Sequence, residues 1–340
     1  MLNLIFWNDI LICGIIVSVI SFFLILILTP KMIKLLISKG QIVDDYHKPD
    51  RPSIPRPAGP VILTGIAGAE IVLYLLTMDL KIIAILLSTV TAFFIGFIDD
   101  KKKVLPGWFK PVALTIAAIP LIALGAHGTY LNLIFGTAYI PVLYIPLIIT
   151  IIPIVGNTIN SIDVLNGAVS GFVIITSVPL LVSIAIFGNN VVFIAALPLL
   201  FGTLAFYKYH KFPSKIFPGD SGTLLLGAMY GAVAIVGNSE IIGVIALLPA
   251  VMNSFLFLSS VKRIVEHRQV KFRPTVLTED FMLTASREQN APITLLRLIL
   301  AEGPLPETKI VRQILILASF SSVLAFISII IQYYSLQGLL

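Results

Sequence analysis

Acidic side chains mark three polar segments that lie far apart along the sequence. Asp99 and Asp100 stand side by side where the uncharged run 82–98, 17 residues long, ends. Adjacent carboxylates repel each other and are costly to remove from water, so the pair indicates a place where a cation or a proton is handled. Asp163 and Asp220 occupy the other two segments.

Amide side chains accompany these acids at Asn157, Asn160 and Asn166. Carboxylate and amide oxygens are hard ligands of the kind that suits Mg²⁺, with Mn²⁺ as a substitute. The amides could instead cap helices in a re-entrant turn, and Asp220 could cap a helix that follows it. The sequence favours a divalent-metal site and leaves the structural role open.

Basic residues in the same polar segments could hold phosphate: Lys101 to Lys103, Lys110, Arg268, Lys271 and Arg273. Carboxylates, a divalent metal and lysine or arginine together are what phosphoryl transfer requires, because positioning and charge neutralisation do most of that chemistry. Residues 101–103 could equally be topology anchors beside a helix end. Lys110 directly precedes Pro111 after a turn, and is the better phosphate ligand.

The composition places these residues in an integral membrane protein. The 340-residue chain is 58% hydrophobic and 12% charged, and apolar runs of about 20 residues, the length that spans a bilayer, recur from end to end. We expect spans at 10–30, 57–78 and 82–98, two within 111–162, two within 164–207, and one each at 221–239, 241–261 and 313–340. The predicted fold class is an all-α membrane protein with about ten transmembrane helices.

The distribution of lysine and arginine sets the expected orientation. Basic residues beside spans stay on the cytoplasmic side, and placing both termini outside puts 22 of the 23 basic residues inside. The acids and amides then face the cytoplasm. Membrane topology alone also accounts for the net charge of +6, so we expect no nucleic-acid partner.

The whole chain, 1–340, is expected to form one polytopic domain with a cytoplasmic insertion at about 262–308. Its single cysteine, Cys13, excludes disulfides within one chain. Glu70 lies in the middle of a span, where we expect it to pack against a polar neighbour. His47, His127 and His210 are interpreted as surface or loop histidines without a catalytic role.

Three motifs give the chain a family resemblance. They are Phe97-Ile-Asp-Asp100 followed by Leu105-Pro and Lys110, then Asn157-x-x-Asn160-x-x-Asp163-x-x-Asn166-Gly167, then Phe217-x-Gly219-Asp220-x-Gly222-Thr223. In this order they resemble the polyprenyl-phosphate N-acetylhexosamine-1-phosphate transferases. The resemblance implies a cytoplasm-facing cleft among ten helices, bound Mg²⁺, and transfer of a sugar 1-phosphate from a UDP-sugar to a polyprenyl or dolichyl phosphate with release of UMP.

The same resemblance implies roles for individual residues. Asp220 and Asn160 match the magnesium positions, and Lys110 matches a lysine that holds phosphate. Asp99 or Asp100 would lie near the incoming polyprenyl phosphate and could deprotonate it. The remaining catalytic position is Asp163, and the substrate-binding positions are Asn157, Asn166, Gly167, His267, Arg268 and Arg273, of which the last three would grip the sugar-nucleotide pyrophosphate.

Smaller features indicate the branch of the family. The segment 291–313 and the first polar loop resemble the dolichyl-phosphate N-acetylglucosamine-1-phosphotransferases of protein glycosylation, whereas Asp163 resembles the bacterial pattern. The mixture fits an archaeal enzyme in a prokaryotic cell membrane, with the endoplasmic reticulum membrane as the alternative for a eukaryotic chain. N-acetylglucosamine is the expected sugar. A homodimer is one assembly that the sequence allows.

Two functions of other classes are kept as alternatives. A membrane transporter of a polar or phosphorylated solute also uses asparagines, acids and broken helices, although at the bilayer midplane. A magnesium-dependent membrane prenyltransferase uses aspartate pairs, but its N-D-x-x-D pattern does not surround Asp99 and Asp100.

Overall fold

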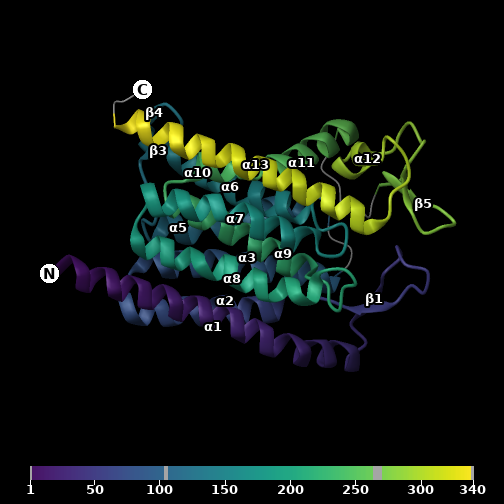
Figure 1. The fold of residues 1–340 in the computed structure, drawn as a ribbon, viewed down its shortest axis with the longest axis horizontal. Helices are drawn as coiled ribbons and strands as arrows, with labels where there is room; N and C mark the ends of the chain where they lie inside the picture. The colour runs from purple at the N-terminus through teal and green to yellow at the C-terminus, as the bar shows by residue number, and fades with distance from the viewer. Residues whose placement is uncertain (1, 103–105, 263–269, 338–340) are drawn as a thin grey trace.

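A computed structural model describes residues 2–102, 106–262 and 270–337 of the chain. The described residues form a bundle of long apolar helices whose two termini lie at the same end, while the hairpin β1–β2, strand β5 and helix α12 lie at the opposite end (Figure 1). We call this second end the predicted cytoplasmic end. The even number of crossings that the sequence predicts requires this arrangement of the termini.

The first half of the bundle is formed by long helices and one short broken segment. The long helices are α1 (Leu2–Ser38), α2 (Gly59–Thr77), α3 (Leu80–Lys102) and α6 (Pro141–Asn160). Between α3 and α6 the chain forms α4 (Phe109–Leu114), a 3₁₀ turn η1 (Thr115–Ala118) and α5 (Ile119–Ala123). Proline at positions 111 and 120 suits the first turns of such short helices, where no backbone N–H is needed.

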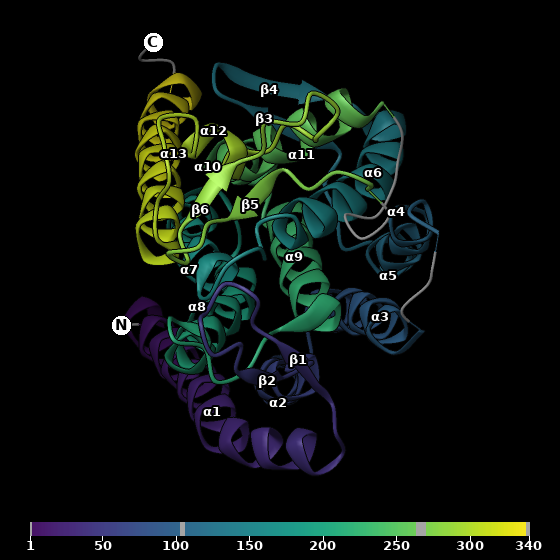
Figure 2. The same cartoon turned by 90° about the vertical axis from the view of Figure 1, so that its right-hand side faces the viewer.

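The second half contains α7 (Ala168–Phe187), α8 (Asn190–His210), α9 (Gly219–Val236), α10 (Glu240–Ala246), α11 (Leu248–Val261) and α13 (Glu307–Leu336). Helix α12 (Leu295–Ile299) is a short element of the predicted insertion. Every residue of α9 is buried, and the helix lies in the middle of the bundle with α3 and α6 beside it (Figure 2).

Three two-stranded antiparallel hairpins occur within the described ranges: β1 (Ile42–Asp44) with β2 (Ser53–Pro55), β3 (Tyr130–Leu133) with β4 (Gly136–Tyr139), and β5 (Thr275–Leu277) with β6 (Leu283–Ala285). The first pairs Val43 with Ile54 and the third pairs Val276 with Thr284. Hairpins β1–β2 and β5–β6 stand in front of α9 in the end view (Figure 2).

The fold confirms the predicted class of an all-α multi-pass membrane protein. Within the described residues eight helices are long and apolar enough to cross a membrane, and the bent pair α10–α11 makes a ninth if it is one span. The remaining predicted span coincides with the shorter apolar segment Phe109–Ala123. Helix α1 continues eight residues beyond the predicted end at 30, through Pro30 to Ser38.

Glu70 makes no hydrogen bond to the polar neighbour expected for it. The side chain is fully buried in α2, and neither carboxylate oxygen has a hydrogen-bond partner among the described residues.

Candidate active site

Three aspartates from two separate motifs meet at the predicted cytoplasmic end of the bundle. Asp99 and Asp100 lie in the last turn of α3, and Asp220 lies in the first turn of α9. The two helices approach closely because position 96 is glycine. A Cβ atom at Gly96 would lie only 2.4 Å from the backbone oxygen of Asp220, so a larger residue would push the carboxylates apart.

Two basic side chains bridge these aspartates. Lys110 Nζ lies 3.1 Å from Asp99 Oδ2 and 3.4 Å from Asp220 Oδ1. Arg56 Nη2 lies 3.1 Å from Asp100 Oδ1 and 3.4 Å from Asp220 Oδ2. We call these five residues the carboxylate cluster. Asp220 is its centre, because each of its carboxylate oxygens faces a different cation.

The two adjacent aspartates have different surroundings. Asp100 accepts hydrogen bonds from the backbone N–H of Asp220 at 3.0 Å and of Ser221 at 2.9 Å, and from the Ser221 hydroxyl at 2.7 Å. It therefore caps the N-terminus of α9 from a neighbouring helix, where a carboxylate is stabilised by free N–H groups and the helix dipole. Asp99 instead faces Lys110, and its side chain is fully buried.

Asn160 reaches the same turn of α9 through a threonine. The Thr223 hydroxyl donates a 2.6 Å hydrogen bond to Asn160 Oδ1 at the C-terminal end of α6. Thr223 lies one turn after Gly219 and next to Asp220 on the helix. The two residues predicted to bind magnesium, Asp220 and Asn160, are thus joined across α6 and α9.

The cluster suits a hard divalent cation that completes its shell with substrate. In the described part of the chain no group of three or more His, Cys, Asp or Glu side chains is arranged to hold a metal ion. Mg²⁺ does not need one, since it is usually held by one or two carboxylates together with phosphate oxygens and water. Asp220 and Asn160 offer oxygen ligands of this kind.

Replacing Thr223 with valine is expected to lower the rate of sugar 1-phosphate transfer about tenfold. Valine keeps the shape of the threonine side chain, but the hydrogen bond that orients Asn160 is lost. The rate would be compared with that of Thr203→Val. Thr203 is also fully buried and donates to a backbone carbonyl, Leu199 O at 2.6 Å, but it lies on α8. Equal rates for the two variants would contradict a positioning role for Thr223.

Asp163 follows α6 and lies beside a buried histidine. Its Oδ1 atom is 3.7 Å from Nε2 of His210, while Nδ1 of the same ring is 2.8 Å from the Ser170 hydroxyl. His210 is 1% exposed and is packed against the rings of Phe206 and Phe217. The interpretation of His210 as a surface or loop histidine is therefore wrong.

Burial raises the pKa of the Asp163 carboxyl to about 7. The positive charge of Arg56 opposes this shift, and the negative charges of Asp220 and Asp100 add to it. Asp163 is therefore within electrostatic reach of the carboxylate cluster and changes charge near neutral pH.

The contribution of Asp163 to the stability of the metal-free protein is expected to be lost as the pH rises from about 4 to about 7. An acid whose pKa in the folded state exceeds its unfolded value of about 3.9 holds a proton more tightly when folded, so its contribution to stability disappears across that interval. Asp163→Asn should lose less stability over the same range. Thermal unfolding of both proteins in a metal chelator would test this, and identical pH dependence would contradict the raised pKa.

Asn166 is the centre of a second buried network that joins four segments. Its backbone N–H and its side-chain Nδ2 donate to Glu307 Oε1 at 2.7 and 2.6 Å, and Nδ2 also lies 3.1 Å from Asp45 Oδ2. Its Oδ1 accepts from the Ser214 backbone at 2.7 Å and from Lys48 Nζ at 3.2 Å. The Asn166 side chain thus ties the first polar loop to the start of α13.

Gly167 and Asn157 have local roles that the structure makes visible. Gly167 precedes α7 with φ at +81°, a left-handed conformation that favours glycine. Asn157 donates from Nδ2 to Pro153 O at 2.8 Å, one turn back on α6. Substrate binding by Asn157, Asn166 and Gly167 stays a prediction.

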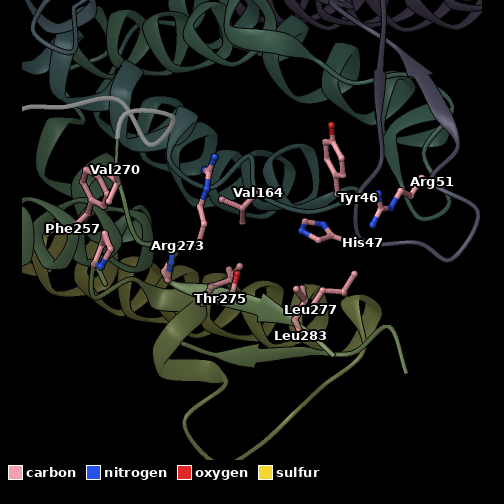
Figure 3. Close-up of a pocket in the computed structure, with 13 residues that line it drawn as sticks. Tyr46, His47, Arg51, Val164, Phe257, Val270, Arg273, Thr275, Leu277 and Leu283 are labelled. Carbon is pink, nitrogen blue, oxygen red and sulfur yellow. The ribbon is translucent and has the colours of Figure 1, made fainter. Parts of the chain in front are cut away.

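A pocket of about 580 Å³, lined in part by Val164, opens between the first polar loop and the insertion. Tyr46, His47 and Arg51 lie on one side of it and Arg273 on the other, with Val164 between them (Figure 3). Arg273 was predicted to bind the substrate pyrophosphate, and it does line a cavity large enough for a small ligand. The other two residues of that prediction, His267 and Arg268, lie outside the described residues.

The sequence analysis gave no role to Arg56 or Thr223, and it placed His210 wrongly at the surface or in a loop. Arg56 ends a proline-rich stretch, and Thr223 closes the Gly219-Asp220 motif, so both lie inside segments that were recognised. Their roles depend on partners far along the chain, such as Asp220 for Arg56 and Asn160 for Thr223. Spacing alone does not reveal such pairs.

Comparison with known proteins places this geometry in a family. The model of glycosyl transferase family 4 matches residues 82–238, which include all four aspartates of the predicted site. A protein of Saccharolobus solfataricus, provisionally named a UDP-N-acetylglucosamine–dolichyl-phosphate N-acetylglucosaminephosphotransferase, is 32% identical over 64% of this chain and 69% of its own length.

Bacterial relatives are similar over the same share of the chain. A phospho-N-acetylmuramoyl-pentapeptide-transferase of Caldicellulosiruptor bescii is 31% identical over 64% of this chain and 72% of its own length. A Bacillus subtilis protein, provisionally named an undecaprenyl-phosphate N-acetylglucosaminyl 1-phosphate transferase, is 26% identical over 64% of this chain and 62% of its own length. The names of these three relatives differ in the sugar that is transferred. The two names that include a lipid differ in that lipid as well.

Proposed function

The chain belongs to glycosyl transferase family 4, and we propose that it transfers N-acetylglucosamine 1-phosphate from UDP-N-acetylglucosamine to a polyprenyl phosphate of the dolichyl type. The observation that carries the proposal is the carboxylate cluster, in which three aspartates, a lysine and an arginine meet at one end of a membrane bundle. The names of the archaeal and bacterial relatives support the reaction class.

The reaction joins two phosphate groups that repel each other. An oxygen of the lipid phosphate attacks the β-phosphorus of the UDP-sugar, a new P–O bond forms, and the bond to the UMP oxygen breaks. The products are a sugar pyrophosphoryl lipid and UMP. Neutralising and aligning these charges is the main task of the protein.

Residues of the carboxylate cluster divide this task. Lys110, which is 4% exposed, presents a fixed positive charge between Asp99 and Asp220 and can hold a substrate phosphate. Asp99, which pairs with Lys110, would accept a proton from the lipid phosphate as it attacks. Asp100 keeps the start of α9, and therefore Asp220, in position.

Magnesium would be held by Asp220 and Asn160, where it would neutralise the pyrophosphate and make UMP a better leaving group. The oxygen ligands at these two positions support the choice of Mg²⁺ over a softer metal.

The pocket lined by Val164 is where we place the UDP-sugar. It has arginines at 51 and 273, aromatic side chains at 46 and 47, and apolar side chains from the ends of α11 and α12. Arginine suits phosphate contacts and aromatic rings suit a nucleobase. The archaeal relative supports a location in a prokaryotic, archaeal cell membrane with this pocket on the cytoplasmic side.

A transfer assay with the purified protein tests the function. UDP-N-acetylglucosamine carries separate labels in the sugar and in the β-phosphate, and polyprenyl phosphate and Mg²⁺ are supplied. Both labels are expected in the lipid, with release of UMP. Sugar transfer without the β-phosphate would make the protein an ordinary glycosyltransferase. Transport of the substrate without chemical change would support the transporter alternative.

A further inference from the structure

Asp220, the central predicted metal ligand, is engaged by protein cations on both carboxylate oxygens. Lys110 Nζ lies 3.4 Å from Oδ1, and Arg56 Nη2 lies 3.4 Å from Oδ2. A divalent cation that binds Asp220 would therefore meet two positive charges within a few ångströms. At least one of them has to move away, because like charges at this distance repel strongly.

Arg56 is the cation of the two that can move. Its side chain is 33% exposed, whereas that of Lys110 is 4% exposed. Arg56 also lines a second pocket of about 470 Å³, together with Asp100, Lys101 and Phe97. This pocket gives the guanidinium a neighbouring space to turn into.

The backbone around Arg56 is fixed while its side chain is not. The Arg56 N–H donates to Gln41 O at 3.1 Å, and the residues on either side bond to the segment that leads into α9. Phe217 N–H donates to Pro55 O at 2.9 Å, and Ala58 N–H donates to Phe217 O at 2.9 Å. The side chain therefore turns about an anchored point next to Asp220.

We propose that Arg56 is an exchangeable counter-ion of the active site, which holds Asp220 before substrates bind and then binds a substrate phosphate when a divalent cation takes its place. This rests on the proposed transfer reaction, and it adds a phosphate-binding residue that the motifs do not contain. The guanidinium keeps the buried aspartates neutralised in the empty site. Once displaced, it presents a planar set of N–H donors that suits phosphate oxygens.

The first test measures binding of Mn²⁺ alone to the purified, substrate-free protein by electron paramagnetic resonance. Arg56→Gln removes the competing charge and is expected to bind Mn²⁺ about tenfold more tightly than the wild type. Lys39→Gln is the matched control, because it removes one positive charge from an exposed position near the start of hairpin β1–β2. Unchanged or weaker Mn²⁺ binding by Arg56→Gln would overturn the proposal.

The second test measures transfer kinetics for the same variants. Arg56→Gln is expected to have a KM raised about tenfold or more for the substrate whose phosphate the arginine binds. A rise for the UDP-sugar assigns it the nucleotide pyrophosphate, and a rise for the polyprenyl phosphate assigns it the lipid. An unchanged KM for both substrates would overturn the phosphate-binding part of the proposal.

The two measurements separate failure of the exchange from failure of the function. Tighter Mn²⁺ binding in Arg56→Gln, in a wild-type protein that transfers no sugar phosphate, would support the exchange and contradict the proposed reaction. Active wild-type protein in which Arg56→Gln changes neither Mn²⁺ affinity nor KM would support the reaction and contradict the exchange.

Discussion

Replacing Asp220 with asparagine is expected to lower sugar 1-phosphate transfer by about a thousandfold or more. The variant loses the charge that faces Lys110 on one side and Arg56 on the other, and with it the proposed contact to magnesium. Shape is nearly unchanged, and Asp100 still accepts the two backbone hydrogen bonds at the start of α9. The fold should therefore persist while turnover is lost.

Initial rates in the labelled transfer assay would measure this loss, and thermal unfolding in detergent would show that the variant is folded. Asp280→Asn is the matched control, since it makes the same change at an exposed position of the predicted insertion. Transfer by Asp220→Asn within tenfold of the control would remove Asp220 from the active site.

The motifs were sufficient to predict that Asp99, Lys110 and Asp220 gather, because each of these residues lies near a helix end, but they did not predict that Arg56 joins them. Asp99, Lys110 and Asp220 belong to segments that the positive-inside rule places on one side of the membrane, and the structure brings their side chains within 3.4 Å of one another in pairs. Their catalytic roles stay predictions. The motifs did not show that Asp99 and Asp100 have different partners. Asp100 accepts hydrogen bonds from the first N–H groups of α9, whereas Asp99 pairs with Lys110.

Other features depend on tertiary contacts that no local pattern encodes. The partner of Arg56 lies 164 residues further along the chain, and that of Thr223 lies 63 residues earlier. His210 ends a helix beside lysines at 208 and 211, which suggests a surface position, yet aromatic side chains from its own helix and from residue 217 bury it.

The number of spans was harder to predict than the fold class. Hydropathy identifies apolar runs, but it does not show where a helix breaks. The run that begins at 111 forms short helical pieces and then the hairpin β3–β4, because prolines and glycines interrupt it before α6 starts at Pro141. Similarly, α10 and α11 meet at an angle of 73°.

Replacing Asp100 with alanine is expected to destabilise the protein by about 3 kcal/mol or more, and replacing Asp99 with alanine considerably less. Asp100 accepts three hydrogen bonds from Asp220 and Ser221, and each buried donor left without an acceptor costs about 1–3 kcal/mol. Asp99 pairs with Lys110 at 3.1 Å, and Lys110 has a second carboxylate, that of Asp220, at 3.4 Å.

The two alanine variants therefore separate a structural carboxylate from a reactive one. Thermal and denaturant-induced unfolding in detergent should rank Asp100→Ala well below Asp99→Ala in stability, whereas Asp99→Ala should lose transfer activity while it remains folded. Ser221→Ala gives an independent check, because it removes one donor to Asp100 and leaves the carboxylate in place. If Asp99→Ala proved the less stable protein, α9 would not depend on Asp100 for its cap, and the assignment of proton transfer to Asp99 would lose its structural basis.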